Sequence, residues 1–142
     1  MPITLVPLAV EHLQVLDGLI SAAELAMTAA QPNVYHFRAV LDGDTCVGMV
    51  GLNRAGDPQL VAATIPAERR KGYATAAVLE MARLAFADLG LPEVYAVCQA
   101  GRPSNGVVAK AGFAFAGQQG NDRYYRLAKA AWQAAQPAPA PG

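Results

Sequence analysis

Apolar residues return along the chain at two different spacings, and these spacings predict alternating helices and strands. Between residues 74 and 89 they recur every three or four positions with charged residues between them, which predicts a helix that buries one face. Gly90 and Pro92 end this helix. Apolar runs at residues 59–65 and 93–99 predict one strand before the helix and one after it.

The N-terminal part of the chain predicts a strand, two helices and a hairpin. The first strand is bounded by prolines, so it is expected at an edge of the sheet. The hairpin is expected because Asp42-Gly43-Asp44, a typical tight-turn sequence, separates two strand candidates. The predicted elements are, in order, a strand at residues 3–8, helices at residues 10–23 and 24–30, and strands at residues 34–41 and 45–53.

The C-terminal part predicts a short helix at residues 104–111 and two last strands at residues 113–117 and 123–127. The whole order predicts an α/β fold with a mixed sheet. Residues 133–142 are rich in alanine and proline and have little to bury, so we expect a disordered tail after one domain at residues 1–132.

Charge and composition exclude several classes of partner. The 142 residues carry eleven basic and eleven acidic side chains, so no overall field draws the protein to nucleic acid or to a membrane. Cys46 and Cys98 lie in apolar runs and are expected to be buried, with no disulfide and no metal site. Neither a secretory signal nor a long apolar segment is visible, which favours a cytoplasmic protein.

Three consecutive cations, at residues 69–71, stand directly before Gly72 and the start of the central helix. Small residues follow at Ala74 and Thr75, so backbone N–H groups can approach an anion closely. The dipole of the helix adds partial positive charge at the same place. We therefore expect a phosphate-binding loop here, although a solvated run of surface charges would have the same composition.

The spacing Arg69-x-x-Gly72-x-Ala74 resembles the pyrophosphate loop of the GNAT superfamily, the acetyl-CoA-dependent N-acyltransferases. A second GNAT signature resembles the stretch that carries Ser104, Lys110, Gly112 and Phe113. The resemblance implies a mixed, mostly antiparallel central sheet of about seven strands flanked by about four helices. It also implies acetyl-CoA as co-substrate, and it is greatest to the branch that contains ribosomal-protein N-terminal acetyltransferases.

The resemblance further implies which residues hold the cofactor. In this family the fourth and fifth strands splay apart, and the pantetheine arm pairs with exposed backbone of the fourth strand. The pyrophosphate lies on the amides of the loop that follows. The cofactor-binding residues implied are Ala63, Thr64 and Ile65 for the arm, and Arg70, Lys71, Gly72, Tyr73, Ala74 and Thr75 for the pyrophosphate.

The general base of the family, a glutamate on or near the fourth strand, has no equivalent in residues 59–65. Glu68 lies in the loop beside the cations and is expected either to shape the loop or to pair with Arg69 or Arg70. Instead of a side-chain base, a water relay that ends on backbone carbonyls could deprotonate the acceptor, with positioning supplying most of the rate; we treat the two as equal alternatives.

The tyrosine that commonly protonates the leaving thiolate in this family corresponds to Val108, which cannot do so. Tyr124 and Tyr125 on the last strand and Ser104 are the substitutes. Adjacent strand residues face opposite sides, so at most one tyrosine points at the site. Tyr124 is favoured as the proton donor because Tyr125 shares a face with Leu127. Ser104 has a local alternative role, since a serine suits the N-cap of the helix at residues 104–111.

The reaction implied is transfer of an acetyl group to a primary amine of a small molecule or of a protein N-terminus. His36 is a candidate acceptor-site base, although a lone histidine in an aromatic strand is more often structural. The alternative function is a CoA-binding regulatory or interaction module with weak or no turnover. Assembly as a homodimer is left open, and the sequence does not name the acceptor.

Overall fold

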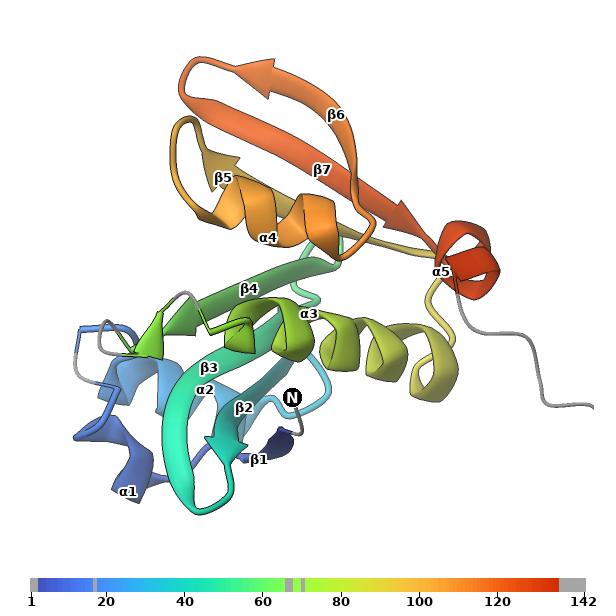
Figure 1. The fold of residues 1–142 in the computed structure, drawn as a ribbon. Coiled ribbons are helices and arrows are strands. Elements are labelled where there is room, and N and C mark those ends of the chain that lie inside the picture. The colour runs from blue at the N-terminus through green and yellow to red at the C-terminus, as the bar shows by residue number, and fades with distance from the viewer. Residues whose placement is uncertain (1–2, 17, 66–67, 70, 136–142) are drawn as a thin grey trace, which may run out of the picture.

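The computed structural model describes residues 3–16, 18–65, 68–69 and 71–135. Strands and helices alternate along this part of the chain as an α/β fold requires (Figure 1). The elements are β1 (Thr4–Pro7), α1 (Val10–Leu13), α2 (Ala22–Ala30), β2 (Tyr35–Asp42), β3 (Thr45–Asn53), β4 (Gln59–Thr64), α3 (Tyr73–Arg83), the π-helical turn η2 (Leu84–Asp88), β5 (Glu93–Gln99), α4 (Ser104–Lys110), β6 (Ala114–Gln119), β7 (Asp122–Ala128) and α5 (Lys129–Ala135).

The strands form one sheet in the order β1-β2-β3-β4-β5-β7-β6, seven strands within the described residues. Every neighbouring pair is antiparallel except β4 and β5, which run parallel. This confirms the expected mixed, mostly antiparallel sheet. The expected hairpin is also confirmed, since β2 and β3 close at Asp42 opposite Thr45, and Gly43 takes the left-handed conformation (φ 61°) that such a turn requires.

Two layers of helices cover the two faces of the sheet. On one face, α3 and α4 lie over the strands (Figure 1), and a large hydrophobic cluster includes Met81, Phe86 and Val108 from these helices and Tyr125 from the sheet. On the other face, the segment from α1 to α2 packs on β1 to β4 through a smaller cluster that contains Leu16. The described part of the chain has five α-helices, where the sequence predicted about four.

The helix predicted over residues 10–23 is wrong in length. Helix α1 ends at Leu13, and Val10 is 74% exposed although the spacing placed it on the buried face. Gly18 has a left-handed φ of 79°, which a continuous helix from residue 10 to residue 23 could not contain. Leu16 and Ile20 are nevertheless buried, because a chain of turns can deliver apolar side chains to the core as well as a helix can.

Helix α5 was not predicted, and it contains the expected domain boundary after Trp132. The helix runs to Ala135, and the Trp132 ring packs against Phe86 with 5.2 Å between ring centroids. The remainder of the predicted tail, residues 136–142, lies outside the described residues. No helix in the described part of the chain has the length and apolar character needed to cross a membrane.

Strand β4 is held close to β3 by a glycine. A side chain added at Gly48 would place its Cβ 2.4 Å from the carbonyl oxygen of Ala63, a backbone atom that cannot move without shifting β4. We predict that Gly48→Ala lowers the free energy of unfolding by about 1–3 kcal/mol. Gly56→Ala, at a loop position with open space, should change it by less than about 0.5 kcal/mol. Denaturant titration measures both, and equal values for the two variants would contradict the close approach.

Candidate active site

Strands β4 and β5 pair at one position and then separate. Within the described residues their register is a single bridge between Gln59 and Tyr95, supported by a 2.8 Å bond from the Tyr95 N–H to the Pro58 carbonyl. On its other edge, β4 pairs with β3 along its whole length, from Gln59 to Thr64. Beyond Gln59, therefore, β4 has no strand partner on its β5 side, and we call this unpaired edge the opening.

The backbone groups that face the opening follow from the alternation of an antiparallel ladder. The Ile65 N–H donates to the Val47 carbonyl at 2.9 Å, so Ile65, and two residues earlier Ala63, direct their backbone groups to β3. The carbonyl of Ile65 also accepts the Glu68 N–H at 2.8 Å. The groups at the opening are therefore those of Ala62 and Thr64. The sequence predicted Thr64 but not Ala62. Which residues of β4 direct their backbone groups to the opening depends on the register with β3.

The N-terminus of α3 lies where the chain leaves this opening. Gly72 is the N-cap, with a left-handed φ of 85° and no side-chain cap. The first bond of the helix runs from the Ala76 N–H to the Gly72 carbonyl at 3.1 Å. The amides of Tyr73, Ala74 and Thr75 thus have no acceptor inside the helix, and they form the positive end of its dipole. A Cβ at Gly72 would meet open space, so a ligand can approach the backbone there.

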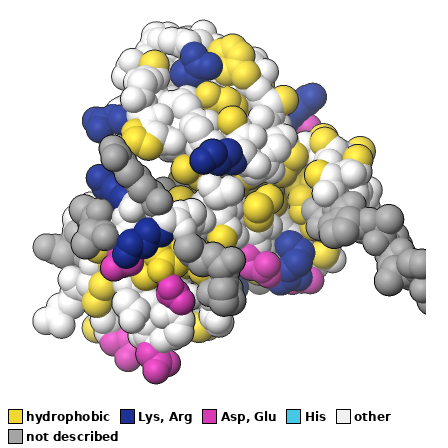
Figure 2. All heavy atoms as spheres, in the orientation of Figure 1, with side chains coloured by type: hydrophobic (Ala, Val, Ile, Leu, Met, Phe, Trp, Pro, Cys, Tyr) yellow, Lys and Arg dark blue, Asp and Glu magenta, His cyan; other side chains and the backbone are white. Residues whose placement is uncertain are grey.

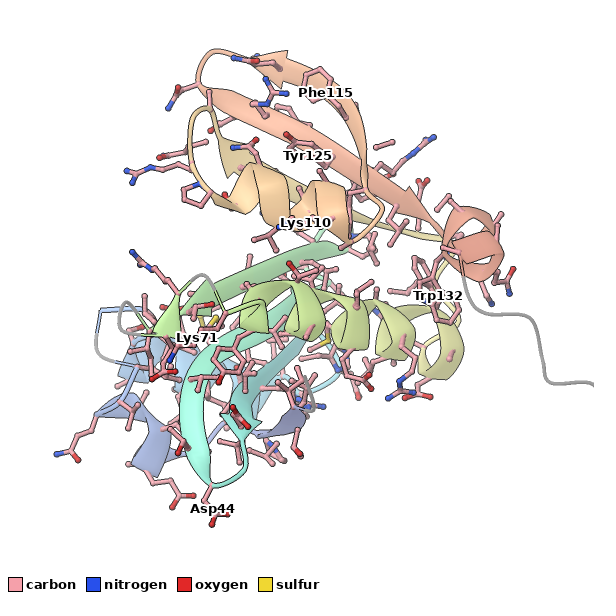
Figure 3. The ribbon with its side chains drawn as sticks, in the orientation of Figure 1. Asp44, Lys71, Lys110, Phe115, Tyr125 and Trp132 are labelled. Atoms are coloured by element: carbon pink, nitrogen blue, oxygen red, sulfur yellow. The ribbon has the colours of Figure 1, made fainter. Side chains whose placement is uncertain are left out.

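Basic side chains stand beside this helix end. Lys71 lies next to the start of α3 (Figure 3), and several other Lys and Arg side chains lie on the same face of the molecule (Figure 2). Glu68 forms an ion pair with Lys71 at 3.0 Å and, within the described residues, none with Arg69, so the expected pairing with Arg69 is wrong. Arg69 is exposed. Arg70 lies outside the described residues.

The sequence matches one known protein family over most of its length. A family model described as the acetyltransferase (GNAT) domain matches residues 11–114. The chain belongs to this family. As a GNAT acetyltransferase, the protein is an acyltransferase. A search of curated proteins found none that matches.

Solved structures of acetyltransferases share the fold. The spermidine N-acetyltransferase from Vibrio cholerae in complex with CoA and spermine matches with a TM-score of 0.77 and 16% identity, over 92% of this chain and 98% of that one. An acetyltransferase from Agrobacterium tumefaciens strain C58 matches with a TM-score of 0.73 and 20% identity, over 88% and 90% of the two chains. At these identities the likeness establishes the GNAT fold alone.

The two tyrosines of β7 face opposite sides of the sheet, as their alternation predicted. Tyr125 (Figure 3) is 5% exposed and belongs to the large hydrophobic cluster together with Leu127 and Val108 of α4, whereas Tyr124 is 36% exposed on the other face. The Tyr125 hydroxyl donates to Asn105 Oδ1 at 2.7 Å and accepts from Arg123 Nε at 3.2 Å. The Tyr125 proton is therefore held in a structural hydrogen bond, whereas no hydrogen bond joins the Tyr124 hydroxyl to another residue in the described ranges.

Ser104 is not the N-cap of α4. The N-cap position is Pro103, and Ser104 is the first residue of the helix, with an exposed side chain. Val108 is buried in the core, 5% exposed, so its position contributes packing.

Asn105 is the residue of α4 that the sequence analysis missed. Its Nδ2 donates to the carbonyl of Gln99 at 2.8 Å and to that of Arg102 at 2.9 Å, while its Oδ1 receives the Tyr125 hydroxyl. One side chain thus joins α4 to the end of β5 and to β7. An asparagine in the first turn of a helix is the only sequence signal, because all its partners come from the fold.

His36 lies at the opposite end of the sheet from the opening. It pairs with Leu52, while the end of β4 at Thr64 pairs with Gly48. His36 Nε2 lies 3.2 Å from the carbonyl of Asn33, and burial lowers its pKa. Its role is therefore structural. Within the described residues, no three His, Cys, Asp or Glu side chains are grouped to hold a metal ion.

Tyr73 ties the start of α3 to the β2–β3 hairpin. Its hydroxyl donates to Asp42 Oδ2 at 2.5 Å, and this bond, followed by burial and the nearby carboxylates, raises the pKa of Tyr73 to about 12. Because the folded-state pKa lies above the ordinary value of about 10, the stabilisation is complete below pH 10 and is lost as the pH rises through about 12.

We predict that Tyr73→Phe lowers the free energy of unfolding at neutral pH, and that the difference from the native protein shrinks between pH 10 and about 12. Denaturant titrations across this range measure the difference. Asp42→Asn should return the ionisation of Tyr73 toward pH 10, which the ultraviolet absorbance of tyrosinate reports. A pH-independent difference between the Tyr73→Phe and native proteins would contradict this assignment.

Proposed function

We propose that this GNAT acyltransferase moves an acetyl group from acetyl-CoA to a primary amine of a small molecule or of a protein N-terminus. The single observation that carries the proposal is the separation of β4 from β5 immediately before the uncapped N-terminus of α3. An extended amide-bearing chain suits the open edge, and a pyrophosphate suits the helix end. The thioester of acetyl-CoA supplies an activated acetyl group.

The residues present fit this donor. Ala62 and Thr64 offer paired donors and acceptors to the amides of the pantetheine arm, in the manner of an added strand. The amides of Tyr73, Ala74 and Thr75, with Lys71 beside them, suit the pyrophosphate. A groove of about 710 Å³ begins one turn along α3 at Ala76 and is lined also by Leu79, Lys110 and Trp132, which gives room for the nucleoside end.

The remaining roles are removal of a proton from the acceptor and supply of a proton to sulfur. Glu68 is paired with Lys71, so we assign acceptor deprotonation to water held by backbone carbonyls at the opening. Tyr124 is the proposed proton donor to sulfur, because its hydroxyl has no hydrogen-bond partner among the described residues, while that of Tyr125 donates to Asn105. Ser104, exposed at the start of α4, is the second candidate.

Two kinds of acceptor remain within the proposal. Small amines are supported by the fold neighbour whose structure contains spermine, a spermidine N-acetyltransferase. Protein N-termini are supported by the resemblance of residues 72–91 to the ribosomal-protein branch, which stays a prediction.

Acetyl-CoA should raise the melting temperature of the protein, and pantetheine alone should raise it much less, because the phosphates bind at the end of α3. Gly72→Val should abolish the shift, since a β-branched side chain both strains a φ of 85° and fills the space at the helix end. Gly90→Val is the matched control, with a φ of 66°, open space and a position beyond the helix. A folded Gly72→Val protein that keeps the shift would place the phosphates elsewhere.

Tyr124→Phe should lower turnover by roughly ten to ten-thousand-fold, the range for loss of a general acid, with acetyl-CoA affinity nearly unchanged. Release of free thiol measures turnover. Ser104→Ala should leave stability within about 0.5 kcal/mol, because Ser104 is not the N-cap. Normal turnover in Tyr124→Phe beside a strong loss in Ser104→Ala would transfer the role to the serine.

A further inference from the structure

The two faces of the opening differ in what covers them. On one face, α3 and α4 pack over the sheet through the large hydrophobic cluster. On the other face, the segment from α1 to α2 packs on strands β1 to β4, and no helix in the described part of the chain contributes to a cluster over β5 and β7 there. A donor whose phosphates lie at the N-terminus of α3 occupies the first face. An acceptor can therefore approach the opening from the second face, over β5 and β7.

Four side chains form a continuous patch on this second face. Val97 pairs directly with Tyr124, and Gln99 pairs directly with Asp122. Buried Ala96, Cys98 and Tyr125 point to the first face, so these four residues point to the second by alternation. Directly opposed residues on adjacent strands lie within side-chain contact. Val97 and Tyr124 are 37% and 36% exposed, so two directly paired apolar side chains lie open on this face.

The β4 side of the opening is also apolar. Val61 and Ala63 of β4 and Ile65 beyond it face the same side as Val97 and are partly buried against the smaller cluster. An acceptor that enters from this face therefore meets aliphatic side chains on the β4 side of the opening, and Val97 and Tyr124 on the side of β5 and β7. Such walls favour a carbon body close to the amine and disfavour additional charges.

This patch contains one carboxylate, that of Asp122. Asp122 is exposed, and no ion pair or hydrogen bond joins its side chain to another residue in the described ranges. The next charged neighbours on this face neutralise one another, since Arg126 pairs with Glu93 at 3.6 Å and Glu93 also accepts the Tyr95 hydroxyl. A single free carboxylate can balance one ammonium group, whereas a polyamine carries several.

We propose that Val97, Tyr124 and Asp122 determine acceptor specificity and select a small primary monoamine with an apolar body. This inference rests on the proposed function. Asp122 attracts the ammonium form, which releases one proton to water before the new C–N bond forms. The C–S bond then breaks, and the N–H proton lost from the acceptor nitrogen is balanced by the proton that the thiol gains.

The test measures kcat/KM with acetyl-CoA for phenethylamine, hexylamine, spermidine and a short peptide with a free N-terminus. We expect phenethylamine and hexylamine to exceed spermidine by about tenfold or more. Val97→Asp should raise KM for phenethylamine about tenfold and narrow the gap to spermidine, while the isosteric Val97→Thr should change KM much less. In the presence of CoA, Val97→Asp should also bind phenethylamine more weakly by calorimetry, in parallel with its higher KM.

Asp122→Asn should raise KM for the amine about tenfold and leave KM for acetyl-CoA unchanged. Asp44→Asn is its matched control, an exposed carboxylate at the far tip of the β2–β3 hairpin (Figure 3), and should change neither. Preference for spermidine or for the peptide, or unchanged amine KM in both Val97→Asp and Asp122→Asn, would overturn the inference while acetyl transfer stands. Absence of any acetyl-CoA shift and of any turnover would overturn the proposed function as well.

Discussion

The proposed site depends on a short length of strand edge at the centre of the sheet that pairs with no neighbouring strand. Backbone N–H and C=O groups are rarely left without partners, and a sheet interior normally pairs all of them. Here the parallel pairing of β4 and β5 stops after Gln59 and Tyr95, which leaves the edge of β4 at Ala62 and Thr64 open. A ligand that contributes its own amides would complete this pairing, and the binding site that we propose here therefore needs no special side chain.

The surrounding elements hold this opening apart. Gly48 allows β4 to lie close to β3, so the edge of β4 is fixed from the opposite side. Asn105 joins α4 to the end of β5 and to Tyr125, which keeps β5 with the C-terminal strands. Tyr73 fastens the start of α3 to Asp42 of the hairpin. The two halves of the sheet are thus stabilised separately on either side of the gap, and the end of α3 is fixed beside it.

In the proposed reaction, the two faces of the sheet serve different substrates. The face with α3 and α4 carries the helix end and its cations, which suit a phosphorylated donor. The opposite face beside the opening carries Val97, Tyr124 and one free carboxylate, which suit a small amine. Adjacent residues of one strand face opposite sides of the sheet. Tyr125 is buried and its hydroxyl donates to Asn105, whereas Tyr124 is partly exposed on the other face.

The sequence by itself determined the strands, the central helix, the tight turn at Gly43 and the glycine at the helix start, because these depend on local spacing and backbone conformation. Only the tertiary structure decided the length of α1, the partner of Glu68 and the role of Asn105. It also decided that Ala62, and not Ala63 or Ile65, joins Thr64 at the opening. The physical reason is that these features depend on strand register and on contacts between distant residues, which no local pattern encodes.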